Sequence, residues 1–373
     1  MRDQQRAIVI QSPHSGRSDL LSQALTFLEQ AGVKVARILS IAELNTLPPQ
    51  GALWREQGMM LAIAAGGDGL VGGVIAHLAA SGLPLGILPL GTANDIARSL
   101  RIPQNLSQAV EVIAQGHTRP IDIGTAQPID LALQQLWQEP TLAPTVPPKQ
   151  ACFAHALTVG LNVQFARIAT NVATRQRFGH LAYPVAALEA MRTHEALEVE
   201  LHFDGLFFPS AQRSMQRPTR TSPVPFDAVP VLRCHALQVT VVNTPFFGGQ
   251  WQLAVPAASY SDRLLDIVVI EERSTGYFNK RLADFFHPEG HVSARPTRTH
   301  ASYPTRHPAE LTSIPGIHHL QARGVTITTS ADPKDATLDG EVRVQTPLQV
   351  QVADEPLNVV VPTIAEQRLA VRS

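Results

Sequence analysis

The first 124 residues alternate short apolar runs with segments of helical periodicity, and this alternation constrains the fold more than any other feature. The apolar runs lie at residues 6–11, 33–40, 59–65, 84–91 and 119–126, and helical patterns lie between them, among them 18–31 and 70–81. Near-continuous apolar strands that alternate with helices are typical of a parallel sheet covered on both faces. We therefore predict an N-terminal α/β domain over residues 1–124.

The pattern changes after residue 124. Runs rich in β-branched residues follow, with a helical exception at 165–192, and they predict an antiparallel β domain over residues 125–362. Stretches rich in Pro, Arg, Ser and Thr near 205–232 and 273–316 read as inserted loops, as does the proline-rich segment 140–149. The tail at 363–373 is a candidate for a return to the first domain. A length of 373 residues agrees with two domains.

Composition narrows the function classes. The formal net charge is −1, so no global basic field indicates nucleic-acid binding. No apolar run approaches the roughly 18 residues of a membrane-spanning helix. The two cysteines cannot form a disulfide framework, and the N-terminus carries no uninterrupted signal-peptide core. We expect a cytoplasmic protein that can still contact a membrane surface peripherally.

A glycine-rich loop, "GGDG", follows the apolar run 59–65 and precedes a helix. At the carboxyl end of a parallel strand, glycines let backbone N–H groups approach an anion, and the helix N-terminus points at the same place. Asp68 within this loop repels phosphate unless Mg²⁺ lies between them. The alternative interpretation is a left-handed turn with a surface aspartate.

Two further small-residue loops strengthen the phosphate interpretation. "PLGTAND" follows the next strand, where Thr92 offers a hydroxyl and Asn94 or Asp95 can cap a helix. "SPHSGRS" follows the first strand and places Arg17 within reach of a phosphate. Loops at neighbouring strand ends line one crevice, as a triphosphate site requires.

These motifs together resemble the diacylglycerol kinase catalytic-domain family, in its bacterial soluble lipid kinase branch, which is related to the sphingosine and ceramide kinases. The resemblance rests on "AGGDG" followed by "LGILPLGTANDIARSL", on "GGQWQLAVPAASYSDRLLDIVVIE" and on "TLDGEV". It implies a phosphofructokinase- and NAD-kinase-like α/β domain, then an antiparallel β-sandwich, with the active site in the cleft between them. It also implies ATP-dependent phosphorylation of a lipid hydroxyl at the membrane surface, and it leaves room for a homodimer.

The resemblance also assigns site residues. Glu341 of "DGE" corresponds to the catalytic base, and Asp339 is placed to orient the metal or the glutamate. A structural Mg²⁺ corresponds to Asp262 with the carbonyls of Ser259 and Leu264. The nucleotide-binding positions, together with our candidates from the loops, are Ser12, Ser15, Gly16, Arg17, Ser40, Ala65, Gly66, Gly67, Asp68, Gly69, Leu70, Val71, Thr92, Asn94 and Asp95.

Departures from the family pattern keep two alternatives open. Leu70 replaces a threonine, Gly72 and Gly73 replace an Asn-Glu pair, and Arg263 replaces the glycine of the metal turn. A soluble-substrate kinase akin to NAD kinase and a catalytically inactive nucleotide- or lipid-binding protein are the rivals. Out of its context, "DGE" is also an ordinary hairpin turn.

Six histidines between residues 287 and 319 invite a metal-site interpretation. Their spacing is irregular, and the segment is rich in Pro, Thr and Arg. We therefore expect a solvated loop there.

Overall fold

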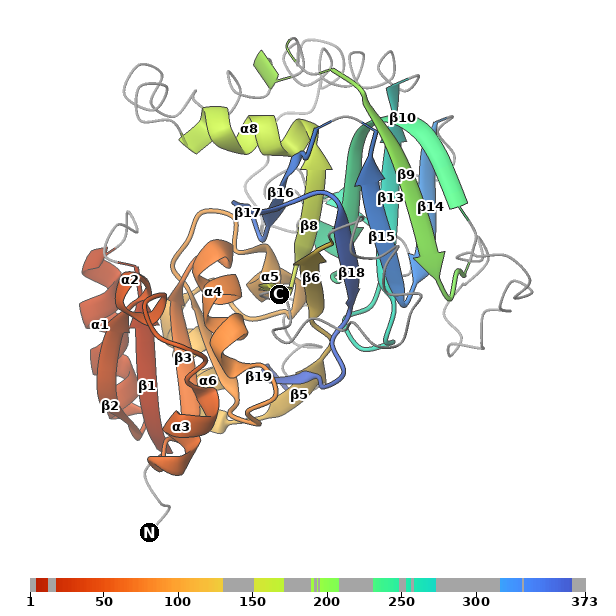
Figure 1. Ribbon diagram of the computed structural model, residues 1–373. Coiled ribbons are helices and arrows are strands. Elements are labelled where there is room, and N and C mark those ends of the chain that lie inside the picture. The colour runs from red at the N-terminus through yellow and green to blue at the C-terminus, as the bar shows by residue number, and fades with distance from the viewer. Residues whose placement is uncertain are drawn as a thin grey trace, which may run out of the picture.

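The computed structural model describes residues 5–12, 18–129, 151–170, 189–190, 193, 195–207, 231–247, 253–255, 258–272, 316–330 and 332–363. Within this part of the chain, two domains lie side by side (Figure 1). The chain crosses between them twice, at residues 122–123 and at residues 353–356.

The first domain is built on a six-stranded sheet with the strand order β2-β1-β3-β4-β19-β5. Its strands are β1 (Gln5–Gln11), β2 (Val33–Ser40), β3 (Leu61–Gly66), β4 (Leu85–Pro89), β5 (Thr118–Ile121) and β19 (Leu357–Val360). Its helices are α1 (Ser18–Gln30), α2 (Ile41–Leu44), α3 (Gly51–Glu56), α4 (Asp68–Leu78), α5 (Asp95–Ser99) and α6 (Leu106–Gln115).

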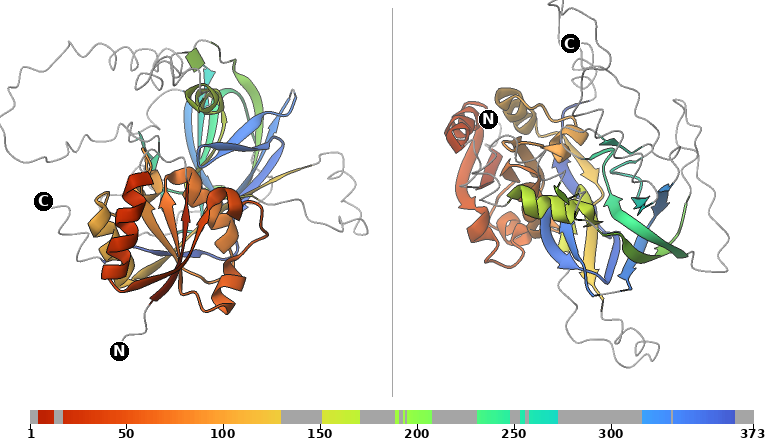
Figure 2. Two further views of the ribbon diagram at one scale, coloured as in Figure 1. Left: turned by 90° about the vertical axis from the view of Figure 1, so that its left-hand side faces the viewer. Right: turned by 90° about the horizontal axis from the view of Figure 1, so that it is seen from above.

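The central strands of this sheet are apolar because helices cover both faces. All residues of β3 and β4 are buried. Helices α1 and α6 contact each other over one face, whereas α2 and α3 contact α4 over the other (Figure 2). The carboxyl ends of the parallel strands β1, β3 and β4 therefore meet at one edge, where the three predicted loops begin.

The last strand of this sheet corrects our domain boundary. We assigned the apolar run at 357–361 to the β domain and left the return to the tail at 363–373. Instead, β19 pairs with β4 in parallel and with β5 in antiparallel orientation. Leu357, Val359 and Val360 are buried in the first core, which explains the near-continuous apolar sequence. Residues 364–373 lie outside the described part.

The second domain is antiparallel throughout its named strand pairs. Its strands are β6 (Gly124–Pro128), β7 (Ala151–Phe153), β8 (Ala156–Gly160), β9 (Leu197–Asp204), β10 (Val231–Val242), β11 (Phe246–Phe247), β12 (Leu253–Ala254), β13 (Leu265–Glu271), β14 (Ile317–Ala322), β15 (Gly324–Thr329), β16 (Asp335–Leu338), β17 (Glu341–Gln345) and β18 (Leu348–Val352). The main sheet has the order β17-β16-β8-β10-β9-β15-β18-β6-β7, with β13 and β14 added beside β10. A parallel α/β domain followed by an antiparallel β domain confirms the predicted fold class.

Several local predictions were wrong at their boundaries. The segment 119–126, predicted as one strand, divides into β5 and β6, which belong to different sheets because the chain changes domain at Asp122. The helix predicted at 165–192 begins earlier, as α8 (Leu161–Thr170), and residues 171–188 lie outside the described part.

The histidine-rich segment also needs a correction at its end. His318 and His319 belong to β14 rather than to a solvated loop, because each pairs with a carboxylate of β13. Most of the two predicted insertions, including residues 208–230 and 273–315, is not described. None of the helices in the described ranges is long and apolar enough to cross a membrane.

Gly124 provides a test of the packing where the chain enters the β domain. It pairs with Phe153 across β6 and β7, and a β-carbon on Gly124 would collide with the fully buried Phe153 ring. We expect Gly124→Ala to lower the free energy of unfolding by about 1–3 kcal/mol through overpacking. Phe153→Leu in the Gly124→Ala background should recover part of that loss in denaturant titrations. Additive losses in the double variant would contradict this explanation.

Candidate active site between the two domains

The loops after β3 and β4 touch each other backbone to backbone. Leu90 donates its N–H to the Gly66 carbonyl at 3.1 Å, and a β-carbon on Gly91 would collide with the Cα atom of Gly67. Gly67 is the N-cap residue of α4, and it offers no side chain to cover the helix N-terminus. The two predicted loops therefore line one crevice, and exposed N–H groups at the start of α4 are available to an anion.

Asp68 has a structural task that the sequence did not reveal. Its Oδ2 accepts the N–H of Asp95 at 3.0 Å, and its Oδ1 accepts the N–H of Ile96 at 2.9 Å. We expected Asn94 or Asp95 to cap this helix, but Asp68 caps α5 from the neighbouring loop. Removal of its side chain should therefore weaken the attachment of α5, by the roughly 1 kcal/mol typical of a cap.

The side chain of Asn94 forms hydrogen bonds that stabilise the second loop, instead of capping α5. It adopts a left-handed conformation with φ of 52°. Its Oδ1 accepts the N–H of Gly91 at 3.0 Å, and its Nδ2 donates to the Gly91 carbonyl and to Gln104 Oε1, each at 3.0 Å. Thr92, in the same loop, is exposed, so its hydroxyl is open to solvent or ligand.

The remaining predicted nucleotide positions are distributed along the same edge. Ser40 is the N-cap of α2 and forms a capping box with Glu43. Ala65, Gly66, Leu70 and Val71 are buried around the glycine loop. Ser12 ends the described part of the first strand region, whereas Ser15, Gly16 and Arg17 lie outside the described residues.

The predicted "DGE" hairpin joins β16 to β17, and its tip is anchored by a buried carboxylate. Asp339 and Gly340 both have positive φ, of 48° and 89°, as a tight hairpin turn requires. Asp339 Oδ1 accepts the N–H groups of His155 and Ala156 at 2.9 and 3.0 Å, and its Oδ2 accepts that of Ala154 at 3.0 Å. Burial raises the pKa of Asp339, while the charge of His155 and these hydrogen bonds oppose the rise.

This hairpin packs on the glycine face of α4 and brings the two domains into contact. A β-carbon on Gly69 would lie 2.6 Å from Glu341 Oε1, and one on Gly72 would lie 2.5 Å from Asp339 Oδ2. At position 72 only glycine leaves room for such an approach, because three hydrogen bonds hold Asp339 in place. Gly72, one of the two glycines that replace the family's Asn-Glu pair, thus has a physical reason.

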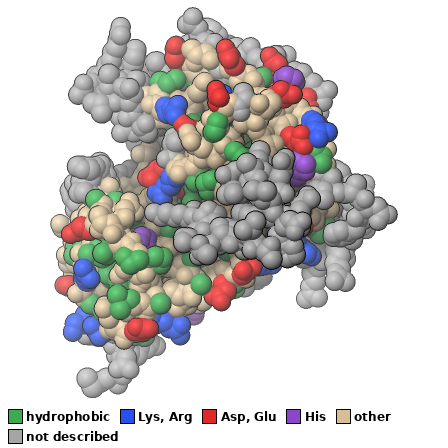
Figure 3. All heavy atoms as spheres, viewed as in Figure 1, with side chains coloured by type: hydrophobic (Ala, Val, Ile, Leu, Met, Phe, Trp, Pro, Cys, Tyr) green, Lys and Arg blue, Asp and Glu red, His purple; other side chains and the backbone are tan. Residues whose placement is uncertain are grey.

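Glu341 lies at the mouth of this contact. Its side chain is 54% exposed and pairs with Arg343, whose Nη2 is 2.5 Å from Glu341 Oε2. Arg343 Nη2 also donates to the Gly69 carbonyl at 3.4 Å. In Figure 3 the surface is hollowed between the domains, and charged side chains of both signs meet there. Glu341 is therefore an accessible carboxylate beside the first turn of α4.

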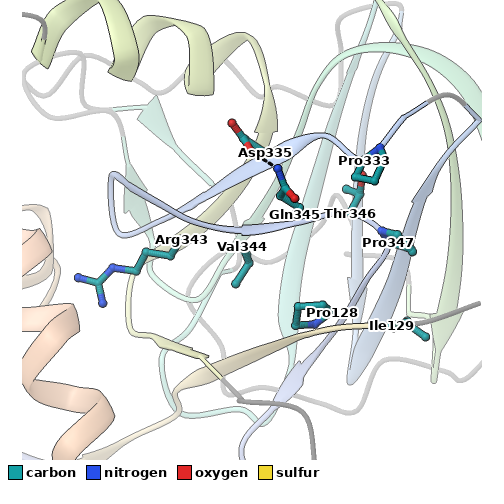
Figure 4. Close-up of a pocket in the computed structure, with 9 residues that line it drawn as sticks. All are labelled: Pro128, Ile129, Pro333, Asp335, Arg343, Val344, Gln345, Thr346 and Pro347. Carbon is teal, nitrogen blue, oxygen red and sulfur yellow. Dashed lines mark hydrogen bonds between the residues drawn. The ribbon is translucent and has the colours of Figure 1, made fainter. Parts of the chain in front are cut away.

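A hollow of about 560 Å³ lies along β17 on the other side of the hairpin. Its lining is mixed, with apolar and polar side chains from β6, β16, β17 and the turn before β18: Pro128, Ile129, Pro333, Asp335, Arg343, Val344, Gln345, Thr346 and Pro347. Arg343 extends from this lining toward α4 (Figure 4). The hollow and the crevice between the glycine loops are thus joined by one side chain.

His155 is a functional candidate that sequence reasoning missed. Its ring is buried, with Nδ1 2.7 Å from Thr244 Oγ1 and Nε2 3.5 Å from Asp95 Oδ2. A single histidine in "CFAHAL" has no spacing signal, so only the folded structure shows that it meets Asp95.

The predicted metal turn lies where the chain crosses between domains. Arg263 has φ of 64°, so the turn keeps a left-handed conformation at this position although the family's glycine is replaced. Its N–H donates to Asp122 Oδ2 at 2.7 Å, and its guanidinium is 3.4 Å from Asp122 Oδ1 and donates to the Asp354 carbonyl at 3.1 Å. Asp122 and Asp354 lie on the two crossing segments, so this turn ties both together.

The side-chain oxygens around this turn supply part of the ligand set that a cation requires. Burial, followed by the charges of Asp266 and Asp122, raises the pKa of Asp262 to about 7, although its exposed position lets solvent screen some of this effect. Two buried acceptors, Asp266 Oδ2 and Asn243 Oδ1, have no hydrogen-bond partner in the described structure. Among the described residues, no three His, Cys, Asp or Glu side chains converge on one ion, so main-chain carbonyls would have to complete the site.

Comparison with known proteins matches both domains to one family. Residues 6–126 match the model of the diacylglycerol kinase catalytic domain, and residues 156–303 match that of the YegS C-terminal NAD kinase beta sandwich-like domain. A solved diacylglycerol kinase from Bacillus anthracis str. Sterne superposes with a TM-score of 0.55 at 19% identity, over 96% of this chain and 97% of that one. This structural likeness concerns the fold.

Two sequence relatives are named diacylglycerol kinase, and a third is uncharacterized. A diacylglycerol kinase of Bacillus subtilis (strain 168) is 27% identical over 73% of this chain and 76% of its own length. A diacylglycerol kinase of Staphylococcus saprophyticus is 23% identical over 90% of this chain and 88% of its own length. An uncharacterized protein of Synechocystis is 25% identical over 82% of this chain, and the match spans 56% of that longer protein.

Two adjacent glycines of α4 provide a matched test of the domain contact. Replacement of either by alanine gains about 1 kcal/mol of helix propensity. In Gly72→Ala the new methyl group would meet Asp339, which three hydrogen bonds hold in place, whereas in Gly73→Ala it would meet the flexible end of Ile41 at 2.9 Å. We expect Gly72→Ala alone to lose stability, by about 1–3 kcal/mol, in thermal unfolding. Equal stability of the two variants would show that the hairpin does not pack tightly on α4.

Proposed function

Because this chain is a divergent member of the diacylglycerol kinase catalytic-domain family, we propose that it is an ATP-dependent lipid kinase that transfers the γ-phosphate to a hydroxyl group of diacylglycerol or a related lipid. The observation that carries the proposal is the approach of Glu341, from the β domain, to Gly69 in the first turn of α4. This approach brings a carboxylate and a phosphate-binding loop together from two domains.

The crevice between the glycine loops would hold the phosphates. The N–H groups at the start of α4 point toward an anion, and neither Gly67 nor Gly69 carries a side chain that would obstruct it. Asp68 keeps α5 and the second loop in register with the first. Bound Mg²⁺ would neutralise the phosphate charge in this reaction class, and the position of Asp68 beside the crevice supports our prediction that it acts near that ion.

Glu341 would accept the proton of the lipid hydroxyl as it attacks the γ-phosphate. Its partial exposure makes it accessible to an acceptor, and its pair with Arg343 orients the side chain. Asp339 would act indirectly, because its bonds to residues 154–156 hold the hairpin that carries Glu341.

The acceptor would be an amphiphile presented at a membrane surface. The hollow beside β17 supports this, since its proline, isoleucine and valine side chains suit an apolar part and Arg343 suits a polar or anionic one. A soluble-substrate kinase would use the same crevice without the hollow, and a binding protein would hold ATP without turnover. Label transfer from ATP to mixed lipids or to NAD distinguishes these three functions.

Replacement of Glu341 tests the proposed base. Glu341→Gln keeps the size and hydrogen bonding of the side chain but cannot accept a proton. We expect label transfer to lipid to fall by about 10²–10⁴-fold, with ATP affinity in calorimetry close to that of the wild type.

Glu200→Gln is the matched control, because Glu200 also pairs with an arginine, Arg233, but on β9 away from the domain contact. It should leave transfer unchanged. Wild-type transfer by Glu341→Gln would assign the base to another residue, whereas absence of transfer by the wild type with every acceptor would favour the binding protein.

Mg²⁺ binding at the interdomain turn is a separate prediction. A cation on Asp262 would stabilise the fold by about 2.7 kcal/mol at a hundredfold excess over its dissociation constant. We expect Mg²⁺ to raise the melting temperature of the wild type but not of Asp262→Ala, with Asp332→Ala, an exposed aspartate of another turn, as the control.

The stabilisation of the fold by Mg²⁺ at Asp262 should change with pH in a definite direction. Without a cation, the raised pKa favours the protonated form of folded Asp262, and this contribution to stability is lost as pH rises through about 7. Mg²⁺ requires the ionised form, so its stabilisation should be larger at pH 8 than at pH 6. The same response at both pH values, or in both aspartate variants, would remove Asp262 from the metal site.

A further inference from the structure

His155 lies where the two domains meet, and it contacts both. Its backbone belongs to the β domain, where its N–H bonds to Asp339 at 2.9 Å and its carbonyl accepts the N–H of Asn243 at 3.0 Å. Its ring reaches the first domain, with Nε2 3.5 Å from Oδ2 of Asp95. One buried residue thus links the start of α5 to the tip of the hairpin.

The same residue lies between the two functional segments of the proposed kinase. On one side, the Asp68 carboxylate of the glycine loop accepts the N–H of Asp95 at the start of α5. On the other side, Asp339 is two positions from Glu341 in the β16–β17 hairpin. Any movement of His155 relative to Asp95 therefore moves Glu341 relative to the phosphate crevice.

Negative charges near the ring favour its protonated form. Burial alone would lower the pKa of His155, but the bond to Asp95 and the negative charges of Asp68, Asp339 and Asp95 outweigh it and raise the pKa above its ordinary value. Two neutral groups lie in the same region: the Thr244 hydroxyl is 2.7 Å from Nδ1, and the thiol of Cys152, whose pKa burial raises to about 11, lies near Asp339. A side chain at 155 that does not reach Asp95 would leave that carboxylate without its partner across the contact.

We propose that His155 is a positioning residue, and that its ring fastens Asp95 of the α/β domain to the Asp339 hairpin so that Glu341 is held at the glycine loop. This inference rests on the proposed function for its catalytic consequence. The fastening itself is a property of the fold and can be measured without any substrate.

The test compares His155→Gln with His319→Gln. Both histidines are buried and paired with an aspartate, but His319 pairs with Asp266 inside the β domain, 2.6 Å away. Hydrogen exchange read by mass spectrometry should become at least about tenfold faster in His155→Gln, both in peptides over residues 94–99 and in peptides over residues 337–343. His319→Gln should change neither segment.

Kinetics supply the second readout. In His155→Gln, kcat should fall by about 100-fold through misplacement of Glu341, while the KM for ATP stays near the wild-type value. Because a raised histidine pKa means that the interaction is present at low pH and lost as pH rises through the folded pKa, the wild type should lose hairpin protection on the alkaline side. In His155→Gln that alkaline limb should be absent.

Each result of these experiments either supports or overturns the proposed role of His155. Faster exchange in the hairpin alone would make His155 a structural residue of the β domain and overturn the proposal, as would faster exchange in both segments with unchanged kcat. If the wild type phosphorylates no acceptor, the proposed function fails, and the exchange data still decide whether His155 fastens the domains. Unchanged exchange in both segments overturns the fastening itself.

Discussion

The three hydrogen bonds that the Asp339 carboxylate accepts from the backbone of residues 154–156 determine where the two domains meet. A buried carboxylate is costly unless it is fully bonded, so this anchor holds the hairpin tip in one place. From that place follow the need for glycine at position 72, the contact of Glu341 with the first turn of α4, and the closeness of His155 to Asp95.

Acidic side chains gather at both places where the domains are joined, and each place has its own basic partner. Asp68, Asp95 and Asp339 surround His155, whereas Asp122 pairs with Arg263 at the chain crossings. Asp122 is 2% exposed and Arg263 is half-exposed, so solvent reaches one side of this pair only. Arg263 stands where the family has glycine, and it thus places a permanent positive charge beside the turn that we propose as a metal site.

Local patterns in the sequence predicted the parts of the fold that local chemistry decides. Runs of apolar residues located β1 to β4, and Asp-Gly located the hairpin, because strand burial and turn conformation depend on neighbouring residues. The pairing of β19 with β4, the capping of α5 by Asp68 and the contact of His155 with Asp95 join residues 27 to more than 250 positions apart. The periodicity of apolar residues in the sequence does not predict contacts between such distant residues, so they could be found only in the folded chain. The reason for glycine at position 72 could not be found in the sequence, since the side chain that fills the space beside it, Asp339, comes from the other domain.

The position of β19 has a consequence for how the protein is made. This strand lies between β4 and β5 in the first sheet, yet it is among the last of the described residues to leave the ribosome. Until then the nascent first domain exposes the open edge of β4, an apolar strand whose neighbour has not been synthesised. The β domain between residues 124 and 352 is therefore synthesised while its neighbour is incomplete, and a fragment that stops at the apparent domain boundary would keep that edge permanently unpaired.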